Sequence, residues 1–252
     1  MTVVAIIQAR MGSTRFPGKM LKKLGDKPLI WYVVYRVKQA KLIDNVVLAT
    51  STNKNNEPLV KEVRKYNVDC FVGNEDDVLD RYYQCAKKFH AVTIVRITGD
   101  CPFIDPDVID QVIMLYTENK LDYASNVLPP TYPDGLDVEV FSFAALEKAW
   151  NEAKLQSERE HVAPYIWKND HMFKRMTLTN NEDLSSIRLT IDEEKDLVLA
   201  NNILQKLNST DFRLKDIMKV IKENPSLLKI NMGIQRNEGY QKSLNEDHTI
   251  KE

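Results

Sequence analysis

Three cations in one short stretch are the first residues of this chain that could do chemistry. Arg10, Arg15 and Lys19 fall within ten residues, although the formal net charge of the whole chain is only −1. Gly12 and Ser13 lie between them, in a loop that follows a short apolar run. Backbone N–H groups of such a loop can bind phosphate oxygens, and the cations add charge-assisted hydrogen bonds. The pattern predicts a phosphate-binding loop; the alternative is a solvated basic turn.

The order of residues in this loop differs from that of two common nucleotide-binding motifs. Lys19 is not followed by the Ser or Thr of a Walker loop, and the glycines do not fit G-x-G-x-x-G. Instead, Gln8-Ala9-Arg10 and residues 13–19 resemble the signature loop of the cytidylyltransferases that activate acidic sugars. These include the 3-deoxy-manno-octulosonate enzymes and the acylneuraminate-type spore-coat polysaccharide proteins. The resemblance implies that the loop binds the triphosphate of CTP and that its three cations are catalytic.

Two aspartates are candidates for binding a divalent cation. Asp100 follows Gly99 at the end of an apolar strand, and this segment resembles the Gly-Asp-x-Pro metal motif of the family. Asp192 matches the first aspartate of the family's strand-Asp-x-x-x-Asp-Leu segment, whereas Asp196 is expected to be solvated. We expect Mg²⁺ to be held by both carboxylates, with phosphates and waters completing its octahedron, and Asp100 to be catalytic. The alternatives are a turn-forming role for Asp100 and a helix N-cap role for Asp192.

Further nucleotide contacts follow from the resemblance alone. In the family, the loop after the second strand and a segment near Gly73 bind the pyrimidine. Together with the phosphate loop, they give the expected nucleotide contacts: Gln8, Ala9, Arg10, Gly12, Ser13, Arg15, Lys19, Thr50, Ser51, Thr52, Arg81 and Thr98. Arg81 could equally form a helical ion pair with Asp77, four residues earlier. Octulosonate enzymes carry Gln where this chain has Thr98, which favours the spore-coat branch.

The acceptor sugar leaves a weaker pattern in the sequence. Residues 134–139 and 157–162 resemble segments of the spore-coat proteins. They supply the candidate sugar contacts Asp137, Glu139, Glu160 and His161, although His161 could simply cap and pack. A sugar acid also needs a cation for its carboxylate, and Arg159 and Arg188 are the candidates.

The elements that must position these residues follow from the apolar pattern. Apolar runs predict strands at residues 3–7, 46–50, 68–72 and 92–97, and helical periodicity predicts helices at 28–37, 57–66 and 76–89. Another helix is expected to begin with Asp105 as N-cap and Pro106 as its first residue. Strands and helices alternate at β-α-β spacing, which favours a parallel sheet with its ligand at the carboxyl ends of the strands.

The second half of the chain is less regular. Strands are predicted at residues 123–125, 136–141, 173–178 and 187–191, and helices at 143–154, 158–168, 195–207 and 214–223. The expected fold class is α/β, a three-layer nucleotide-diphospho-sugar transferase-like (Rossmann-like) fold with a mixed, mostly parallel central sheet. No linker divides the chain, so residues 1–252 are expected to form a single nucleotidyltransferase domain whose end, about 240–252, frays.

Composition narrows the possible functions. A net charge of −1 and a pI near 6.5 argue against nucleic acid as a partner. We expect neither a membrane span nor a signal peptide, because the sequence shows no apolar run of the required length or pattern. Cys70, Cys85 and Cys101 lack C-x-x-C spacing and indicate reduced thiols in a cytoplasmic protein.

The combined expectation is an enzyme that converts CTP and an acidic sugar into a CMP-sugar and pyrophosphate, for cell-surface or spore-coat polysaccharide biosynthesis. The resemblance also implies a homodimer, with residues 129–140 near its contact. A glycosyltransferase of related fold stays open, although its usual Asp-x-Asp motif is not matched at residues 100–102. A non-catalytic nucleotide-binding module also stays open, but it would not need both the cation loop and two metal carboxylates.

Overall fold

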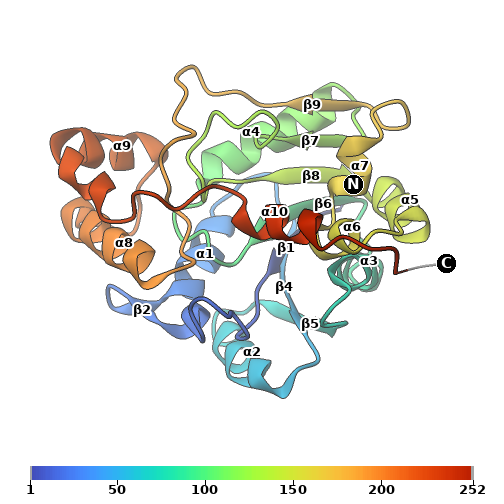
Figure 1. Ribbon diagram of the computed structural model, residues 1–252, viewed down its shortest axis with the longest axis horizontal. Coiled ribbons are helices and arrows are strands. Elements are labelled where there is room, and N and C mark those ends of the chain that lie inside the picture. Colours follow the sequence, from blue (N-terminus) through green and yellow to red (C-terminus); the bar gives the residue numbers. More distant parts are fainter. Residues whose placement is uncertain (1, 251–252) are drawn as a thin grey trace.

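A seven-stranded sheet forms the centre of the computed structural model, which describes residues 2–250 (Figure 1). Its strand order is β5 (Asp69–Gly73), β4 (Asn45–Ser51), β1 (Val3–Gln8), β6 (Thr93–Thr98), β8 (Glu139–Ser142), β7 (Tyr123–Ser125) and β9 (Arg175–Thr177). Strand β8 is antiparallel to both of its neighbours, and the other adjacent pairs are parallel. The predicted mixed, mostly parallel sheet is confirmed. A separate hairpin pairs β2 (Lys23–Leu24) with β3 (Lys27–Pro28).

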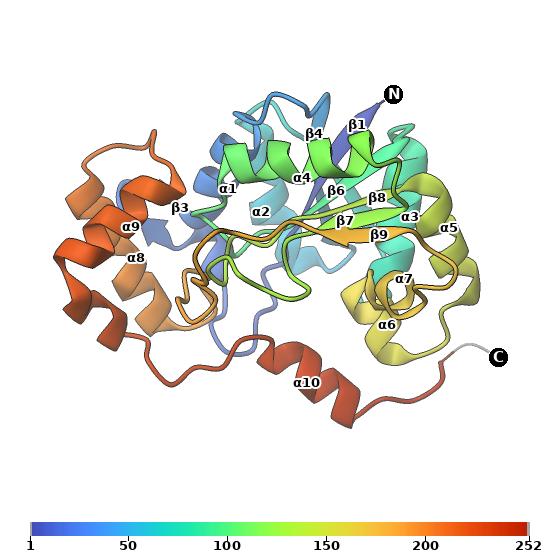
Figure 2. The same ribbon diagram turned by 90° about the horizontal axis from the view of Figure 1, so that it is seen from above.

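Helices cover both faces of the sheet, as Figure 2 shows. One face carries α1 (Leu29–Val37), α2 (Glu57–Arg64) and α4 (Pro106–Glu118), and the other carries α3 (Val78–Lys88), α5 (Phe143–Glu152), α6 (Gln156–His161) and α7 (Pro164–Lys168). Along β1, Ala5 and Ile7 pack into the first layer, whereas Val4 and Ile6 pack into the second. This alternation explains why β1 is a continuous apolar run. The predicted three-layer α/β fold is confirmed.

The helices of the second half differ from the predicted ones at residues 158–168, at the end of α5, which stops at Glu152, and at α10 (Glu238–Asn245), which was not predicted. The single helix expected at residues 158–168 is interrupted, because Val162 has a φ of +72° and α7 begins at Pro164. Proline lacks the N–H that would continue the first helix, and it restricts the residue before it. Helices α8 (Glu194–Leu207) and α9 (Leu214–Glu223) lie within one residue of their predicted bounds. The 3-10 helix η3 (Pro225–Lys229) follows α9.

The strand predicted at residues 187–191 is wrong. This segment makes a single parallel bridge, between Arg188 and Asp134, and is otherwise hydrogen-bonded to loops. The Leu189 N–H donates to Asp134 O at 2.7 Å, and the Ile191 N–H donates to Asp100 O at 2.8 Å. Because these partners sit on two different loops, the segment joins the loops instead of extending the sheet. It thereby brings Asp192 next to Asp100.

The start of α8 also differs from the prediction. Glu193, not Asp192, is the N-cap residue, and the Asp196 carboxylate accepts the N–H groups of Asp192 at 2.9 Å and Glu193 at 3.0 Å. Asp196 is therefore not solvated; it is 2% exposed. The carboxylate of Asp192 is free from a capping role and can point elsewhere.

The end of the chain crosses the molecule as a separate segment. Helix α10 (Glu238–Asn245) lies apart from α8 and α9, and Thr249 forms a β-bridge with Leu155 (Figure 2). The expected fraying of residues 240–252 stays a prediction, and residues 251–252 lie outside the described part. Within residues 2–250, no helix has the length and apolar character needed to cross a membrane.

Gly135 provides a test of the packing that joins these loops. Its φ is +102°, and an added Cβ would lie 2.5 Å from the Thr190 backbone nitrogen. We predict that Gly135→Ala lowers the free energy of unfolding by about 2 kcal/mol or more. The melting temperature should then fall by at least about 4 °C. Gly239→Ala is the matched control, since a Cβ at Gly239 meets no atom within 4 Å. Equal melting temperatures for the two variants would contradict the prediction.

Candidate active site

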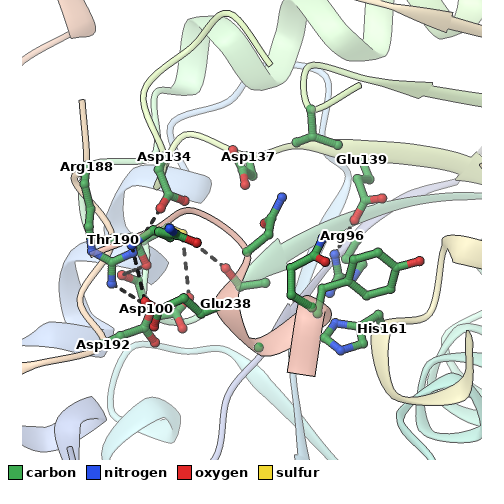
Figure 3. A pocket seen from close by; sticks show the side chains of 18 of the residues that line it. Arg96, Asp100, Asp134, Asp137, Glu139, His161, Arg188, Thr190, Asp192 and Glu238 are labelled. Atoms are coloured by element: carbon green, nitrogen blue, oxygen red, sulfur yellow. Dashed lines mark hydrogen bonds and ion pairs between the residues drawn. The ribbon is translucent and has the colours of Figure 1, made fainter. Parts of the chain in front are cut away.

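The Lys19 ammonium group lies between the two predicted metal carboxylates. Lys19 opens the 3-10 helix η1 (Lys19–Leu21) directly after Gly18, whose φ of +71° turns the chain inward. Lys19 Nζ donates at 2.9 Å each to Asp100 Oδ2, to Asp192 Oδ1 and to the Ile191 carbonyl oxygen. The fold thus brings together three predicted residues from positions 19, 100 and 192 (Figure 3 shows the two aspartates).

Burial and charge in this cluster act in opposite directions on its pKa values. Burial raises the pKa of Asp100, but the Lys19 cation outweighs it and lowers the value to about 2. Burial likewise lowers the pKa of Lys19, and the carboxylates of Asp100 and Asp192 reverse this and raise it. Both Lys19 and Asp100 are therefore charged at neutral pH. The ammonium is held as a fixed donor with three acceptors.

A magnesium site requires carboxylates that converge on one positive charge, and Asp100 and Asp192 do so. Within residues 2–250, no three His, Cys, Asp or Glu side chains form a complete metal cluster. Magnesium, however, is commonly held by one or two carboxylates, with substrate phosphates and waters as its other ligands. The two aspartates fit this type of site.

Arg188 fixes the orientation of Asp192 (Figure 3). Its guanidinium donates to Asp192 Oδ2 at 3.0 Å, to Asp134 Oδ2 at 3.1 Å and to both oxygens of Asp196. Asn231 donates to the same Asp196 carboxylate at 2.9 Å. Because Oδ2 of Asp192 is bound to Arg188, its Oδ1 faces Lys19. Arg188, a candidate contact of the acceptor carboxylate, is instead surrounded by three aspartates.

The other cations of the loop lie on its surface. Arg15 pairs with Asp192 Oδ1 at 3.2 Å and with Glu238 of α10 at 3.1 Å, and 40% of its side chain is exposed. Arg10 is exposed, and its charge adds to burial in lowering the pKa of Arg81. Gly12 is exposed as well. These positions leave the loop open to a polyanion from solvent.

Asn56 anchors the loop to the second strand, a role that the sequence analysis missed. Its Oδ1 accepts the Met11 N–H at 2.8 Å, and its Nδ2 donates to Ser51 Oγ at 2.7 Å. The Ser13 hydroxyl accepts the Phe16 N–H at 3.2 Å and shapes the same turn. The loop and the end of β4 are therefore joined through the Asn56 side chain.

The predicted pyrimidine contacts lie away from the aspartates. Ser51 and Thr52 line a separate cavity of about 580 Å³. Thr50 and Arg81 are buried, and within the described residues Thr50 Oγ1 and Arg81 Nε have no hydrogen-bond partner. The alternative ion pair of Arg81 is not formed, because Asp77 caps α3 and pairs with Arg159 at 2.6 Å. Arg159, the second candidate for the acceptor carboxylate, is occupied by that pair.

A cavity of about 430 Å³ extends from the aspartates toward α6 and α7. Figure 3 shows Asp100 and Asp192 at one end, Arg96 and His161 at the other, and Asp137 above the middle. Arg96 pairs with Glu139, which also accepts the Tyr123 hydroxyl at 2.7 Å. Thr98 lines the same cavity. The volume is that of a small-molecule site.

The four candidate sugar residues are not equivalent. Asp137, Glu139 and His161 line the cavity, whereas the carboxylate of Glu160 accepts the Ser243 hydroxyl at 2.8 Å. His161 contacts the same hydroxyl at 3.0 Å. Burial lowers the pKa of His161 to about 4, so its ring is neutral at neutral pH. The ring can therefore donate or accept a hydrogen bond without adding a charge to the cavity.

Sequence reasoning missed several residues of this cavity. Arg96, Asp134, Glu238 and Tyr240 were not predicted, and all four line it. Arg96 did leave a signal, since a lone cation inside an apolar strand must face a polar site. The contributions of Glu238 and Tyr240 could not be read from the sequence, because they depend on where α10 crosses the molecule.

Comparisons with known proteins show what the whole chain is similar to. A family model described as cytidylyltransferase matches residues 4–232. The chain is 38% identical over 240 residues to the uncharacterized protein MJ1063 of Methanocaldococcus jannaschii, covering 94% of this chain and 97% of that protein. It is 32% identical over 231 residues to the spore coat polysaccharide biosynthesis protein SpsF of Bacillus subtilis, covering 88% of this chain and 95% of SpsF.

A more distant relative and two solved structures complete the comparison. The 3-deoxy-manno-octulosonate cytidylyltransferase of Geobacter sulfurreducens is 36% identical over 121 residues, 47% of each chain. A cytidylyltransferase from Leptospira borgpetersenii superposes with a TM-score of 0.88 at 35% identity, covering 94% of this chain and all of that one. A CMP:2-keto-3-deoxy-manno-octonic acid synthetase complexed with CTP shares the fold, with a TM-score of 0.64, 16% identity and coverage of 82% and 99%.

Asp137 gives a testable pH dependence. Burial, reinforced by Asp134 and Glu139, raises its pKa to about 7, although Arg236 and Arg96 oppose the shift. The folded-state pKa of Asp137 thus exceeds the ordinary value of 3.8. The stability that depends on a protonated Asp137 is fully present below about pH 4 and is lost as the pH rises through 7. We predict that wild-type protein loses stability over this range and that Asp137→Asn loses less.

Melting temperatures of both proteins between about pH 4 and 8 would test this linkage. Asp170→Asn is the control, because 69% of the Asp170 side chain is exposed. Parallel profiles for wild type and Asp137→Asn would show that Asp137 does not retain its proton.

Proposed function

The chain belongs to the cytidylyltransferase family, and from this we propose that it transfers the cytidylyl group of CTP to a hydroxyl of a sugar acid, releasing pyrophosphate. One observation carries the proposal. Asp100 and Asp192 converge on Lys19 beside Arg15, at the carboxyl end of β6. Nucleotidyl transfer needs this combination of carboxylates for a metal ion and cations for phosphates.

The reaction is an in-line substitution at phosphorus. The sugar hydroxyl oxygen forms a bond to the α-phosphorus, the bond from that phosphorus to the pyrophosphate oxygen breaks, and the hydroxyl proton passes to solvent water. Arg10 and Arg15 bind the departing phosphates, while the fixed positive charge of Lys19 stabilises the negative charge that grows in the transition state. Asp100 and Asp192 would hold Mg²⁺, which supplies electrostatic stabilisation of the phosphoryl oxygens.

The nature of the acceptor rests on the relatives and on the cavity. SpsF is named for spore coat polysaccharide biosynthesis. The Geobacter relative, which is matched along 47% of its length, is named for an octulosonate. By analogy with these relatives, we propose that the acceptor is a sugar acid and that the protein acts in cell-surface or spore-coat polysaccharide synthesis. In the cavity, Arg96 and Arg188 already pair with carboxylates. An acceptor carboxylate would join the Arg96 pair as a further partner, because Arg188 is already surrounded by three aspartates.

A panel of substrates tests the proposal. With Mg²⁺ present, we predict pyrophosphate release from CTP in preference to ATP, GTP and UTP, and with sugar acids in preference to sugar phosphates. Omission of Mg²⁺ should abolish the reaction. Equal rates with all four nucleotides would reject the cytidylyl specificity, and a preference for sugar phosphates would reject the acid.

Asp192→Asn serves as the variant arm of the same assay. Since Asp192 is not the cap of α8, the variant should melt within a few degrees of wild type but lose most activity and require more Mg²⁺. Asp211→Asn is the control, because 71% of that side chain is exposed. A fully active Asp192→Asn protein would exclude the two-carboxylate site.

We also propose a homodimer, on the resemblance alone, with residues 129–140 near its contact. Light scattering at micromolar concentration should give twice the 29.1 kDa mass of one chain. A monomer at that concentration would reject this part of the proposal.

A further inference from the structure

The C-terminal strap, residues 233–250, adds a wall to the active-site cavity from outside the matched family region. The family model ends at residue 232. Six residues of the strap nevertheless line the cavity that holds Asp100 and Asp192: Gln235, Asn237, Glu238, Gly239, Tyr240 and Gln241. Figure 2 shows the strap passing outside the rest of the fold, with α10 in its middle. Access to the cavity therefore depends on where this segment lies.

The strap is fastened at both of its ends. Before it, Asn231 is buried and donates to Asp196 at 2.9 Å. After α10, the Gln156 N–H donates to His248 O and the Ile250 N–H donates to Lys154 O, both at 2.9 Å. The middle of the strap thus cannot leave the molecule, but it can move between two fixed points.

The middle of the strap is weakly packed. Ser243 is the only buried residue of α10. Gly233 has a φ of +90° with open space around it, and the adjacent Met232 is 75% exposed. Segments with few buried contacts open at low free energy, and a glycine next to a fixed residue can absorb the backbone change. Lifting α10 breaks the hydrogen bonds of Ser243 with Glu160 and His161, and it separates the Tyr240 ring from the rings of His161 and Trp167.

Contacts of Glu238 and Arg236 help to hold this middle part over the cavity. Glu238 pairs with Arg15 at 3.1 Å, and the Arg236 guanidinium donates to Asp137 and to the Tyr132 carbonyl oxygen. Arg15 belongs to the loop that we assign to the triphosphate, so the Glu238 carboxylate occupies an anion position there. The side chains of this pair are 40% and 43% exposed, so the pair is weak and a polyphosphate can displace the carboxylate.

We propose that the strap is a cover of the acceptor cavity that nucleotide phosphates release. The Glu238 carboxylate binds Arg15 at the position that a phosphate would take. When the nucleotide phosphates bind Arg15, the contact between Glu238 and Arg15 is lost. Helix α10 then moves away about Gly233, and the cavity opens for the acceptor. The inference rests on the proposed function for the identity of the nucleotide. Displacement of Glu238 from Arg15, however, requires only a polyphosphate.

Calorimetric titration with inorganic triphosphate, without metal, tests the competition directly. Glu238→Gln should bind triphosphate about two- to fivefold more tightly than wild type, the range expected for loss of one exposed ion pair. Glu246→Gln is the matched control. Glu246 directly follows α10 and is exposed, and its substitution removes the same charge as Glu238→Gln. Binding by Glu238→Gln that is no tighter than binding by Glu246→Gln would overturn the proposal.

Hydrogen exchange of the wild-type protein tests the movement. Triphosphate should accelerate exchange of the α10 amides and leave that of the α9 amides unchanged. Unchanged or slower exchange in α10 would overturn the proposal. The two proposals can fail separately: a lack of preference for CTP rejects the cytidylyl assignment alone, whereas failure of either triphosphate test rejects the cover alone.

Discussion

The three hydrogen bonds of the Lys19 ammonium group are the interaction on which the active site depends. A buried cation needs partners with compensating charge, and Lys19 finds them in Asp100 and Asp192, which come from distant parts of the chain. Removing both carboxylates would leave the buried ammonium group without a compensating charge. The phosphate loop, the end of β6 and the start of α8 are therefore held in one arrangement by a single side chain.

That arrangement requires a backbone that brings the three segments together. Residues 187–191 provide it by bonding to the loops that contain Asp134 and Asp100 instead of joining the sheet. Gly135 permits the close approach, since any side chain there would meet the backbone of Thr190. Arg188 then neutralises the surplus of aspartates, so that Asp192 directs one oxygen toward Lys19 and the other toward the guanidinium.

The sequence predicted the parts of this protein that local signals determine. Apolar runs located the strands of the sheet other than the one expected at residues 187–191, and Asp105 and Pro106 marked the start of α4 correctly. Asp196 could not be recognised as buried, because its partner Arg188 precedes the helix and Asp134, which completes the cluster, lies 54 residues from Arg188. The polar strap likewise depends on partners about 90 residues away, such as Ser157 for Asp247. Long-range pairing of polar groups leaves no periodic pattern.

The reversed direction of β8 separates two sources of cavity residues. Because β8 runs against β6, its first residue, Glu139, lies level with Arg96, near the edge where β6 ends. The loop that leads into β8 therefore lines the cavity together with the loop that follows β6. Under the proposed function, substitutions in residues 126–138 would change acceptor preference and leave the loops after β1, β4 and β6 unaltered. Related chains could then diverge in the sugar that they accept while keeping the same chemistry.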